Sequence, residues 1–172
     1  MKTILMKSGD IALIDDKDYD LVSKYNWSVA GNRYARAAAY DTDEKDKNGH
    51  IKQRVIKMHR LIIGAKKNEF VDHINGNGFD NRRENLRICT MSQNMCNQKK
   101  SSANKSGYKG VIAMVGKNHE KRNKKWLSYI NINKKRIYGG YFFTKEEAAE
   151  KYNEMAKKYH GNFSNLNNIV YV

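Results

Sequence analysis

Residues 71–98 read VDHINGNGFDNRRENLRICTMSQNMCNQ and carry the densest polar chemistry of the 172-residue chain. An acid and an imidazole stand side by side at Asp72 and His73, and a stretch rich in glycine and asparagine follows. Asn85-Leu86-Arg87 then leads into a short apolar strand, after which Thr90 can cap the N-terminus of a helix that carries Asn94. Two strands and a helix folded on one another would bring Asp72, His73 and Asn94 together.

The spacing of these residues resembles the HNH endonuclease family, in its branch of phage- and intron-encoded homing endonucleases. The pattern D-H-x-x-G-x(4)-N-x(3)-N-L-R-x-x-T-x(3)-N is filled by Asp72, His73, Gly76, Asn81, Asn85, Leu86, Arg87, Thr90 and Asn94. Upstream, Met58-His59-Arg60-Leu61 resembles the H-R-L segment of that branch, and the resemblance covers roughly residues 1–98. It implies that Asp72 and Asn94 bind a metal ion and that His73 is the general base. It also implies that Asn85 steadies the loop and orients His73.

The chemistry of phosphodiester cleavage agrees with these roles. The reaction needs an activated water, an in-line geometry and a cation for the charge that develops on the phosphate and the leaving oxygen. The Asp72 carboxylate and the Asn94 amide oxygen are hard ligands of the kind that Mg²⁺ takes, and Mn²⁺ is expected to substitute. His73 suits the role of general base because imidazole titrates near neutral pH.

The same residues also allow a purely structural interpretation, without a catalytic role. An Asp-His pair in a loop rich in glycine and asparagine is usually turn chemistry, and asparagine is common at turns and caps. The joint spacing of so many positions favours catalysis for Asp72, His73 and Asn94. His59 can either contact phosphate or pack under the site, and the structural role is favoured for it.

Charge and composition point to a polyanionic partner. The chain has 33 basic and 18 acidic residues, a formal net charge of +15. This charge favours binding to double-stranded DNA or to an anionic membrane surface, and a charge of this size can also serve to keep a protein soluble. No segment resembles a signal peptide or an apolar run of membrane-spanning length, so a membrane role is disfavoured and a cytoplasmic location is expected. Cys89 and Cys96 form no C-x-x-C pair, so no structural zinc is expected.

The C-terminal part predicts three strands followed by one helix. The strands are expected at residues 111–114, 126–132 and 136–142 from their alternating pattern. Thr144 and Glu147 form a T-x-x-E capping box at the start of the helix, and Gly161 can end it. The expected core face of this helix consists of Ala148, Ala149, Tyr152, Met155, Ala156 and Tyr159.

Residues 106–167 resemble the DNA-binding domain of plant ethylene-response factors, a fold also found beside HNH cores in mobile nucleases. The match rests on Tyr108-Lys109-Gly110-Val111, Gly140-Tyr141-Phe142, Glu147-Ala148-Ala149, Tyr152, and His160-Gly161 leading to Leu166-Asn167. That family lays a three-stranded sheet in the major groove with its helix packed behind. DNA contacts are therefore expected for Lys109, Tyr129, Asn131, Arg136 and Tyr138, with Lys124, Lys125, Lys134 and Lys135 near phosphates at the strand ends. Arg87, from the HNH region, is also expected to contact DNA. The alternative is a solvated charged hairpin.

These features predict an α+β protein in three regions. Residues 1–98 are a β-rich N-terminal region leading into a ββα-metal HNH core at about 57–98. Short strands are expected in the first 56 residues, with hairpin turns at 8–10 and 30–32, a solvated loop at 41–49 and a further strand at 51–58. Residues 99–106, KKSSANKS, read as a linker, and residues 107–167 form a three-stranded antiparallel sheet on one helix. Residues 100–172 carry 15 basic and 5 acidic side chains, net +10, so most of the attraction to DNA is expected there.

The leading functional hypothesis is a sequence-directed, Mg²⁺-dependent DNA endonuclease of the homing type, encoded by a phage or mobile element in a bacterial host. The chain holds a single D-H…N…N constellation, which predicts a monomer that nicks one strand. The alternative is a DNA-binding regulator whose HNH scaffold is inactive. A structural nucleoid-type protein would explain the charge but not the HNH spacing.

Overall fold

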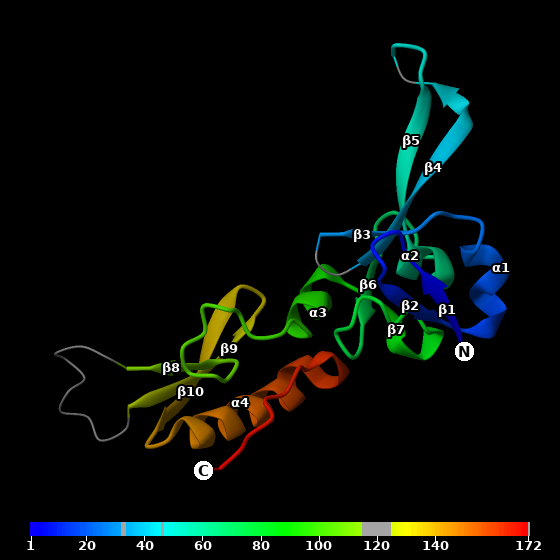
Figure 1. Ribbon diagram of the computed structural model, residues 1–172. Coiled ribbons are helices and arrows are strands. Elements are labelled where there is room, and N and C mark those ends of the chain that lie inside the picture. The colour runs from blue at the N-terminus through cyan, green and yellow to red at the C-terminus, as the bar shows by residue number, and fades with distance from the viewer. Residues whose placement is uncertain (32–33, 46, 115–124, 172) are drawn as a thin grey trace. The chain divides into compact units, whose positions relative to one another are not determined.

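The chain folds into two compact units, Met1–Met91 and Ser92–Val172. The computed structural model (Figure 1) describes residues 1–31, 34–45, 47–114 and 125–171. Four small antiparallel sheets and several helices make up this part of the chain, which confirms the predicted α+β class. The division between the units falls inside a short helix, upstream of the segment expected to be a linker.

The first unit opens with a hairpin of β1 (Lys2–Leu5) and β2 (Ile11–Ile14), paired in register from Lys2↔Ile14 to Leu5↔Ile11. The predicted turn at residues 8–10 connects them, because Gly9 has a φ of 85° that other residues rarely adopt. A 3-10 turn, η1 (Asp16–Asp18), and a one-turn helix, α1 (Tyr19–Val22), follow. Neither of these two turns was predicted from the sequence.

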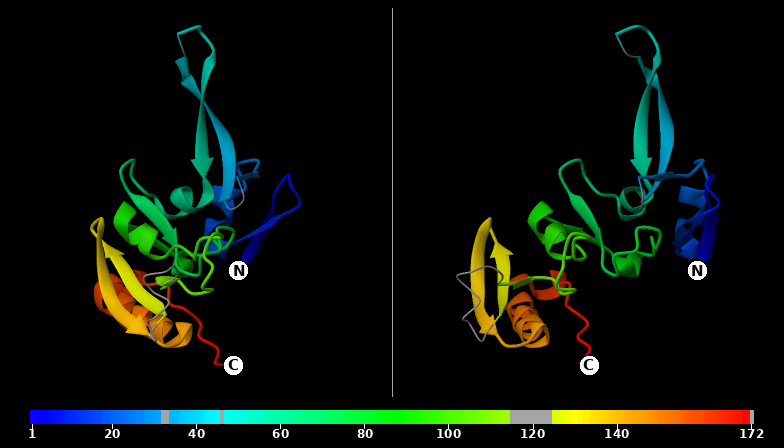
Figure 2. Two further views of the ribbon diagram at one scale, coloured as in Figure 1. Left: turned by 90° about the vertical axis from the view of Figure 1, so that its left-hand side faces the viewer. Right: turned by 60° about the vertical axis from the view of Figure 1, so that its left-hand side comes forward.

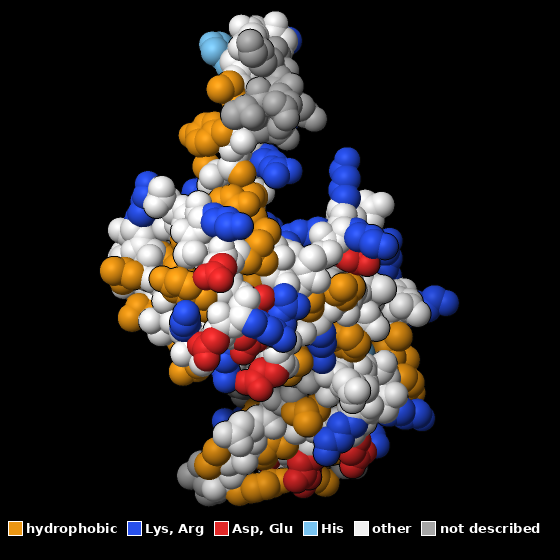
Figure 3. Space-filling view, turned by 90° about the vertical axis from the view of Figure 1, so that its right-hand side faces the viewer, with side chains coloured by type: hydrophobic (Ala, Val, Ile, Leu, Met, Phe, Trp, Pro, Cys, Tyr) orange, Lys and Arg blue, Asp and Glu red, His pale blue; other side chains and the backbone are white. Residues whose placement is uncertain are grey.

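A second sheet has the order β3-β4-β5, from β3 (Ser28–Ala30), β4 (Tyr34–Lys45) and β5 (Ile51–Lys57). The prediction of a solvated loop over residues 41–49 is wrong for residues 41–45, since β4 continues to Lys45 and its backbone pairs with β5 through Asp41↔Lys52 and Lys45↔Ile51. Residues 47–49 form an exposed turn, in agreement with the prediction. A strand ladder is made of backbone hydrogen bonds, so a run of charged residues can occupy an exposed hairpin. The β4–β5 hairpin projects from its unit, and hydrophobic side chains are exposed along it (Figures 1 and 3).

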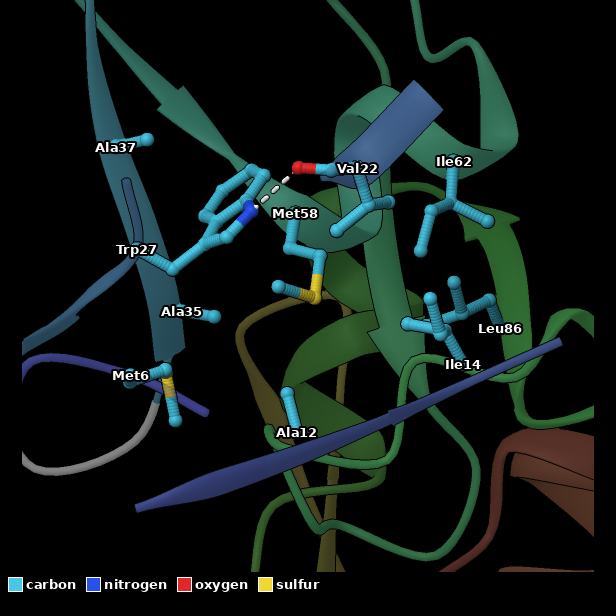
Figure 4. Packing of buried hydrophobic residues seen from close by; sticks show 10 residues of the cluster. All are labelled: Met6, Ala12, Ile14, Val22, Trp27, Ala35, Ala37, Met58, Ile62 and Leu86. Carbon is cyan, nitrogen blue, oxygen red and sulfur yellow. Dashed lines mark hydrogen bonds between the residues drawn. The ribbon is translucent and has the colours of Figure 1, made fainter. Parts of the chain in front are cut away.

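The strand predicted at 51–58 ends at Lys57, because Met58 begins helix α2 (Met58–Ile63). Helix α2 ends at Gly64, whose φ of 67° forms a left-handed cap. The helix packs among the strands, and it contributes Met58 and Ile62 to the core of the unit. Figure 4 shows this core, where the indole Nε1 of Trp27 also donates a 2.8 Å hydrogen bond to the carbonyl of Val22. The buried members are Met6, Ala12, Ile14, Val22, Trp27, Ala35, Ala37, Met58, Ile62 and Leu86.

The HNH segment supplies the last hairpin of the first unit, β6 (Phe70–His73) and β7 (Leu86–Cys89), with the 3-10 turn η2 (Arg83–Asn85) between them. The pairing runs from Phe70↔Cys89 to His73↔Leu86. Helix α3 (Met91–Cys96) follows directly after Thr90, in the place where the sequence predicts a helix. From Ser92 onward α3 belongs to the second unit.

The second unit contains β8 (Val111–Ala113), β9 (Trp126–Ile132) and β10 (Lys135–Phe142), which form one antiparallel sheet with β9 in the middle. Helix α4 (Lys145–His160) lies along one face of this sheet (Figures 1 and 2), and the turn η3 (Gly161–Phe163) follows it. Thr144 and Glu147 form the predicted capping box. These features confirm a three-stranded sheet packed on one helix.

The core between the sheet and α4 closes around Tyr152. Gly110 has a φ of 71°, and a Cβ there would lie 2.0 Å from the Tyr152 ring, so the glycine of the Y-K-G-V segment is needed for close packing. The helix buries Ala148, Ala149, Tyr152, Met155 and Ala156 as predicted. The prediction for Tyr159 is wrong, since that side chain is 42% exposed near the end of the helix, beyond the sheet-covered stripe.

Candidate active site and DNA-binding surface

Asp72 and Arg87 face each other across the β6–β7 hairpin. They are directly paired in the register, so both side chains leave the same face of the two strands. The Nε and Nη2 atoms of Arg87 donate to Oδ2 of Asp72 at 2.8 and 2.6 Å. Both side chains are largely buried, at 17% exposed for Arg87 and 6% for Asp72. Arg87 is therefore paired with a buried carboxylate, and its expected contact with DNA stays a prediction.

His73 ends β6 and is 4% exposed. Its Nε2 lies 3.2 Å from Oδ1 of Asn81, a residue that is itself completely buried. Burial lowers the pKa of His73, while the hydrogen bond to Oδ1 of Asn81 and the charge of Asp72 partly oppose this. The imidazole is thus kept neutral near neutral pH, which is the form that a general base requires.

Asn85 holds the loop that follows His73. Its Oδ1 accepts from the backbone N–H of Asn75 at 3.0 Å, and its Nδ2 donates to the carbonyl of Asp80 at 2.7 Å. Asn85 therefore connects two parts of the loop, and its implied role in orienting His73 stays a prediction. The side chain that contacts the imidazole, however, is Asn81, which the sequence pattern contains but to which no role was given.

Asp80 and its partners complete the loop. Its carboxylate accepts from Nε and Nη2 of Arg82 at 2.8 and 2.7 Å and from Nδ2 of Asn75 at 2.9 Å. The bonds from Arg82 lower the pKa of Asp80 below its ordinary value. Gly76, with a φ of 67°, turns the chain and donates its N–H to the carbonyl of His73. The loop is therefore built from short-range polar contacts.

The N-terminal strands and turns support this loop from outside. Leu13 of β2 donates its N–H to the carbonyl of Phe79 and accepts from the N–H of Asn81, each at 2.8 Å. Arg83 donates from Nε, shared between both carboxylate oxygens, and from Nη2 to Asp18, a residue that is 3% exposed. The β-rich region thus positions the residues on either side of the His73–Asn81 contact.

The ring of His73 also belongs to a cluster of three rings, together with those of His59 and Tyr34. The ring of His59, from α2, stands edge-on to His73 with centroids 5.0 Å apart, and Tyr34 of β4 contacts His59 and His73 at 5.2 and 5.7 Å. His59 is 5% exposed, and its Nδ1 is buried with no hydrogen-bond partner among the residues that the structure describes. Burial, followed by the charge of His73, lowers the pKa of His59 to about 3. These contacts agree with the structural role favoured for His59.

Asn94, the third expected member of the site, lies on α3 in the second unit and is half-buried. The first unit by itself brings together Asp72, His73 and Asn85. In the described parts of the chain, no three His, Cys, Asp or Glu side chains gather as a metal-binding group.

The face of the β8–β10 sheet opposite α4 carries four of the residues expected to contact DNA. Arg136 pairs with Asn131, and Tyr138 pairs with Tyr129, across β9 and β10. The guanidinium of Arg136 lies 4.1 Å from the ring centroid of Tyr129, and Tyr138 is 62% exposed. Basic and aromatic groups are therefore interleaved on an open surface, as in many nucleic-acid-binding sheets.

The lysines expected to contact DNA differ in their exposure. Lys134 and Lys135 lie exposed at the β9–β10 turn, and Lys125 is exposed just before β9, whereas Lys124 lies outside the described residues. Lys109 does not point to an open surface. Its ammonium donates to the carbonyls of Cys96 and Gln98, each at 2.6 Å, because the β8 end of the sheet meets the segment after α3.

Comparisons with known proteins agree with this site. A family model for HNH endonuclease matches residues 57–96, from α2 to the end of α3. Over 171 residues the chain is 30% identical to an uncharacterized HNH endonuclease of Acanthamoeba polyphaga mimivirus, covering 94% of this chain and 76% of that protein. The chain therefore belongs to the HNH endonuclease family, and it is a nuclease that acts on DNA. No solved structure matches it.

The family match ends at residue 96. The resemblance of residues 106–167 to plant ethylene-response factors therefore stays a prediction. None of the described helices has both the length and the apolar character needed to span a bilayer.

Sequence reasoning missed two contacts of His73. Asn81 was visible as a fixed position of the motif, and its spacing could have marked it as a partner of the imidazole. Tyr34 gave no comparable signal, since it precedes His73 by 39 positions in the sequence and meets it only through the β4 fold.

Proposed function

We propose that the protein is a sequence-directed, Mg²⁺-dependent DNA endonuclease of the homing type that nicks one strand. The observation that carries this proposal is the buried contact between His73 and Asn81, one residue away from a buried carboxylate at Asp72. A buried, oriented and neutral imidazole beside a carboxylate is costly to maintain in a loop and is the arrangement that general-base hydrolysis uses. Its action is expected inside the host cell, where its DNA substrate lies.

The side chains define how the base works. In the proposed mechanism Nε2 of His73 donates to Oδ1 of Asn81, and Nδ1 is the basic atom. Nδ1 then takes a proton from the water that attacks phosphorus, and the bond between phosphorus and the leaving oxygen breaks. Asn85 keeps the loop fixed through Asn75 and Asp80, so that the imidazole does not have to reorganise during the reaction.

Asp72 and Asn94 are the residues that would hold the metal ion. When bound, a divalent ion stabilises the negative charge that develops on the phosphate and the leaving oxygen. One carboxylate and one amide oxygen fit Mg²⁺ or Mn²⁺ better than zinc. Arg87 holds Asp72 in place within the buried hairpin through their ion pair.

The second unit is the proposed DNA reader. In the fold of plant ethylene-response factors the open face of the sheet enters the major groove, and here that face carries Tyr129, Asn131, Arg136 and Tyr138. Lys125, Lys134 and Lys135 would contact phosphates, which adds affinity without sequence information. The domain would direct the nuclease to its target site.

A nick and a monomer follow from the single site. The sequence holds one set of Asp72, His73, Asn85 and Asn94, and one such site aligns one phosphate at a time. A double-strand break would need a second copy or rebinding on the opposite strand. We therefore propose a monomer that binds along an asymmetric target.

The test uses supercoiled plasmid at low salt, where discrimination between sequences is weakest. With Mg²⁺ the plasmid should become open circle, EDTA should stop the reaction, and His73→Ala should be slower by about 10²–10⁴-fold with unchanged DNA binding. Cleavage that continues in EDTA, or near-normal turnover by His73→Ala, would contradict the proposal.

Two further outcomes of the same assay have clear meanings. Linear DNA at the earliest times, with a rate that rises as the square of the protein concentration, would indicate a dimer that breaks both strands. Tight binding without cleavage in any divalent ion would favour the alternative, a DNA-binding regulator with an inactive HNH scaffold.

A further inference from the structure

Helix α3 needs support from outside itself. It has six residues, Met91–Cys96, and none of them is buried. An isolated helix shorter than about 12–15 residues is marginal in water, because nucleation costs more than a few hydrogen bonds return. The carbonyls at the C-terminal end of such a helix also lack partners within it. The position of Asn94 therefore depends on what holds the end of α3.

Side chains of the sheet domain hold that end. Nζ of Lys109 donates to the carbonyls of Cys96 and Gln98, each at 2.6 Å. Nδ2 of Asn165 donates to the carbonyl of Asn97 at 2.8 Å. Three successive carbonyls at and after the helix terminus are thus bound by two side chains. A cation at this end also interacts favourably with the helix dipole. We call these two side chains and three carbonyls the Lys109 clamp.

The clamp is connected to helix α4 by asparagines. The backbone N–H of Lys109 donates to Oδ1 of Asn167 at 2.7 Å, and its carbonyl accepts from Nδ2 of Asn167 at 3.0 Å. Asn167 in turn exchanges two hydrogen bonds with Asn153 of α4, at 2.7 and 3.0 Å. Lys109 is half-buried, and burial lowers the pKa of its ammonium. The lysine is therefore fixed at both its backbone and its side chain.

We propose that Lys109 is a positioning residue of the nuclease and not a DNA contact: it anchors α3, the helix that carries Asn94, to the DNA-reading sheet. This inference rests on the proposed function, in which Asn94 is a metal ligand. Residues 99–106 are expected to be a linker. The clamp also makes them a loop within one unit, because Lys109 on one side of them is bonded to Cys96 and Gln98 on the other. The clamp makes α3 move with the sheet domain, so that binding of the sheet to DNA also positions Asn94.

The experiment compares Lys109→Met with Lys109→Arg in the full chain, and Lys125→Met is the matched control. Methionine keeps the apolar stem of Lys109 but removes its donors, whereas arginine keeps donors at that position. Lys125 is an exposed lysine of the same unit for which a phosphate contact is proposed. Three measurements are made: hydrogen exchange of the α3 amides, DNA affinity at several salt concentrations in EDTA, and nicking rate against Mg²⁺ concentration.

For Lys109→Met, exchange of the α3 amides should rise by about tenfold or more, because two charge-assisted hydrogen bonds are lost. Exchange within α4 should stay unchanged. DNA affinity and its salt dependence in EDTA should match the unsubstituted protein within about twofold, as expected when no phosphate contact is removed. The Mg²⁺ concentration for half-maximal nicking should rise by about tenfold, the order of effect seen when a partner that positions a metal ligand is removed. Lys109→Arg should recover most of both effects.

Lys125→Met should show the opposite pattern, with weaker DNA binding, a flatter salt dependence and unchanged α3 exchange. Asn165→Leu removes the other donor of the clamp and should also loosen α3, which provides a second test if Lys109→Met folds poorly.

Two results for Lys109→Met would overturn the inference. One is weaker binding with a flatter salt dependence, as for the control. The other is unchanged nicking, whether or not α3 exchanges faster. Failure of the proposed function is distinguishable, since the unsubstituted protein would then not nick with Mg²⁺, or Asn94→Ala would nick normally. The exchange and affinity measurements would still decide whether Lys109 anchors α3 or contacts DNA.

Discussion

Oδ1 of Asn81 lies 3.2 Å from Nε2 of His73, and both residues are buried. Asn81 is itself held by β2, because its backbone N–H donates to the carbonyl of Leu13. The orientation of the imidazole therefore depends on a strand near the N-terminus, about 60 positions before the HNH motif.

The first prediction concerns this contact. Asn81→Ala should lower kcat for nicking by about 10–100-fold with little change in KM, because the imidazole loses the partner that sets its tautomer. Asn81→Asp keeps an acceptor for Nε2 and should recover part of the loss. Asn77→Ala, an exposed change in the same loop, is the control and should leave kcat unchanged within a few-fold. Equal effects of the alanine substitutions at positions 77 and 81 would indicate general loosening of the loop.

A second prediction addresses the ion pair between Asp72 and Arg87. Arg87→Met removes the ion pair of a buried carboxylate, so the free energy of unfolding should fall by about 3 kcal/mol. Glu84→Gln breaks an ion pair with Arg82 in which Glu84 is 71% exposed, and it should cost less than about 1 kcal/mol. Urea titrations measure both. Added Mg²⁺ should raise the stability of Arg87→Met more than that of the unsubstituted protein, and an equal response would argue against a metal ion at Asp72.

The third prediction follows from the burial of His59. Its pKa is about 3 in the folded protein against 6.5 for an ordinary histidine, so between these values the unfolded chain binds a proton that the folded chain does not. This contribution to stability is complete above pH 6.5 and falls by about 1.4 kcal/mol per pH unit as the pH drops toward 3. His59→Phe should flatten the pH dependence of the urea midpoint in that range. Met58→Leu, a buried change that does not titrate, should leave its slope unaltered, and identical slopes in all three proteins would contradict the prediction.

The fourth prediction separates two kinds of contact on the sheet domain. Lys125→Ala should weaken binding to all sequences alike and reduce the slope of log affinity against log salt by about 0.9, as for one lost phosphate contact. Arg136→Ala should instead reduce discrimination between sequences by about 1–3 kcal/mol, if its guanidinium reads a base from the open face. Gel-shift titrations with the selected target and with unrelated DNA distinguish these effects. A uniform loss for Arg136→Ala would place that residue among the phosphate contacts.

Much of this protein follows from local patterns in its sequence. The spacing from Asp72 to Asn94 indicates the HNH family, because that chemistry needs certain side chains at fixed separations in one short segment. The capping box of Thr144 and Glu147 and the strand at Trp126–Ile132 are predicted at their observed places, since caps and alternation act between neighbours in the chain.

The contacts between residues far apart in sequence were decided only by the tertiary structure. Charge alone could not show that Arg87 is turned inward onto Asp72, or that Lys109 binds the end of α3. A basic side chain has the same net charge in both situations, and the choice depends on which carbonyl or carboxylate the fold brings within reach. For the same reason the β4 strand through Asp41 and the contact of Tyr34 with His73 were not foreseen, because each is fixed by a partner strand or helix and not by adjacent residues.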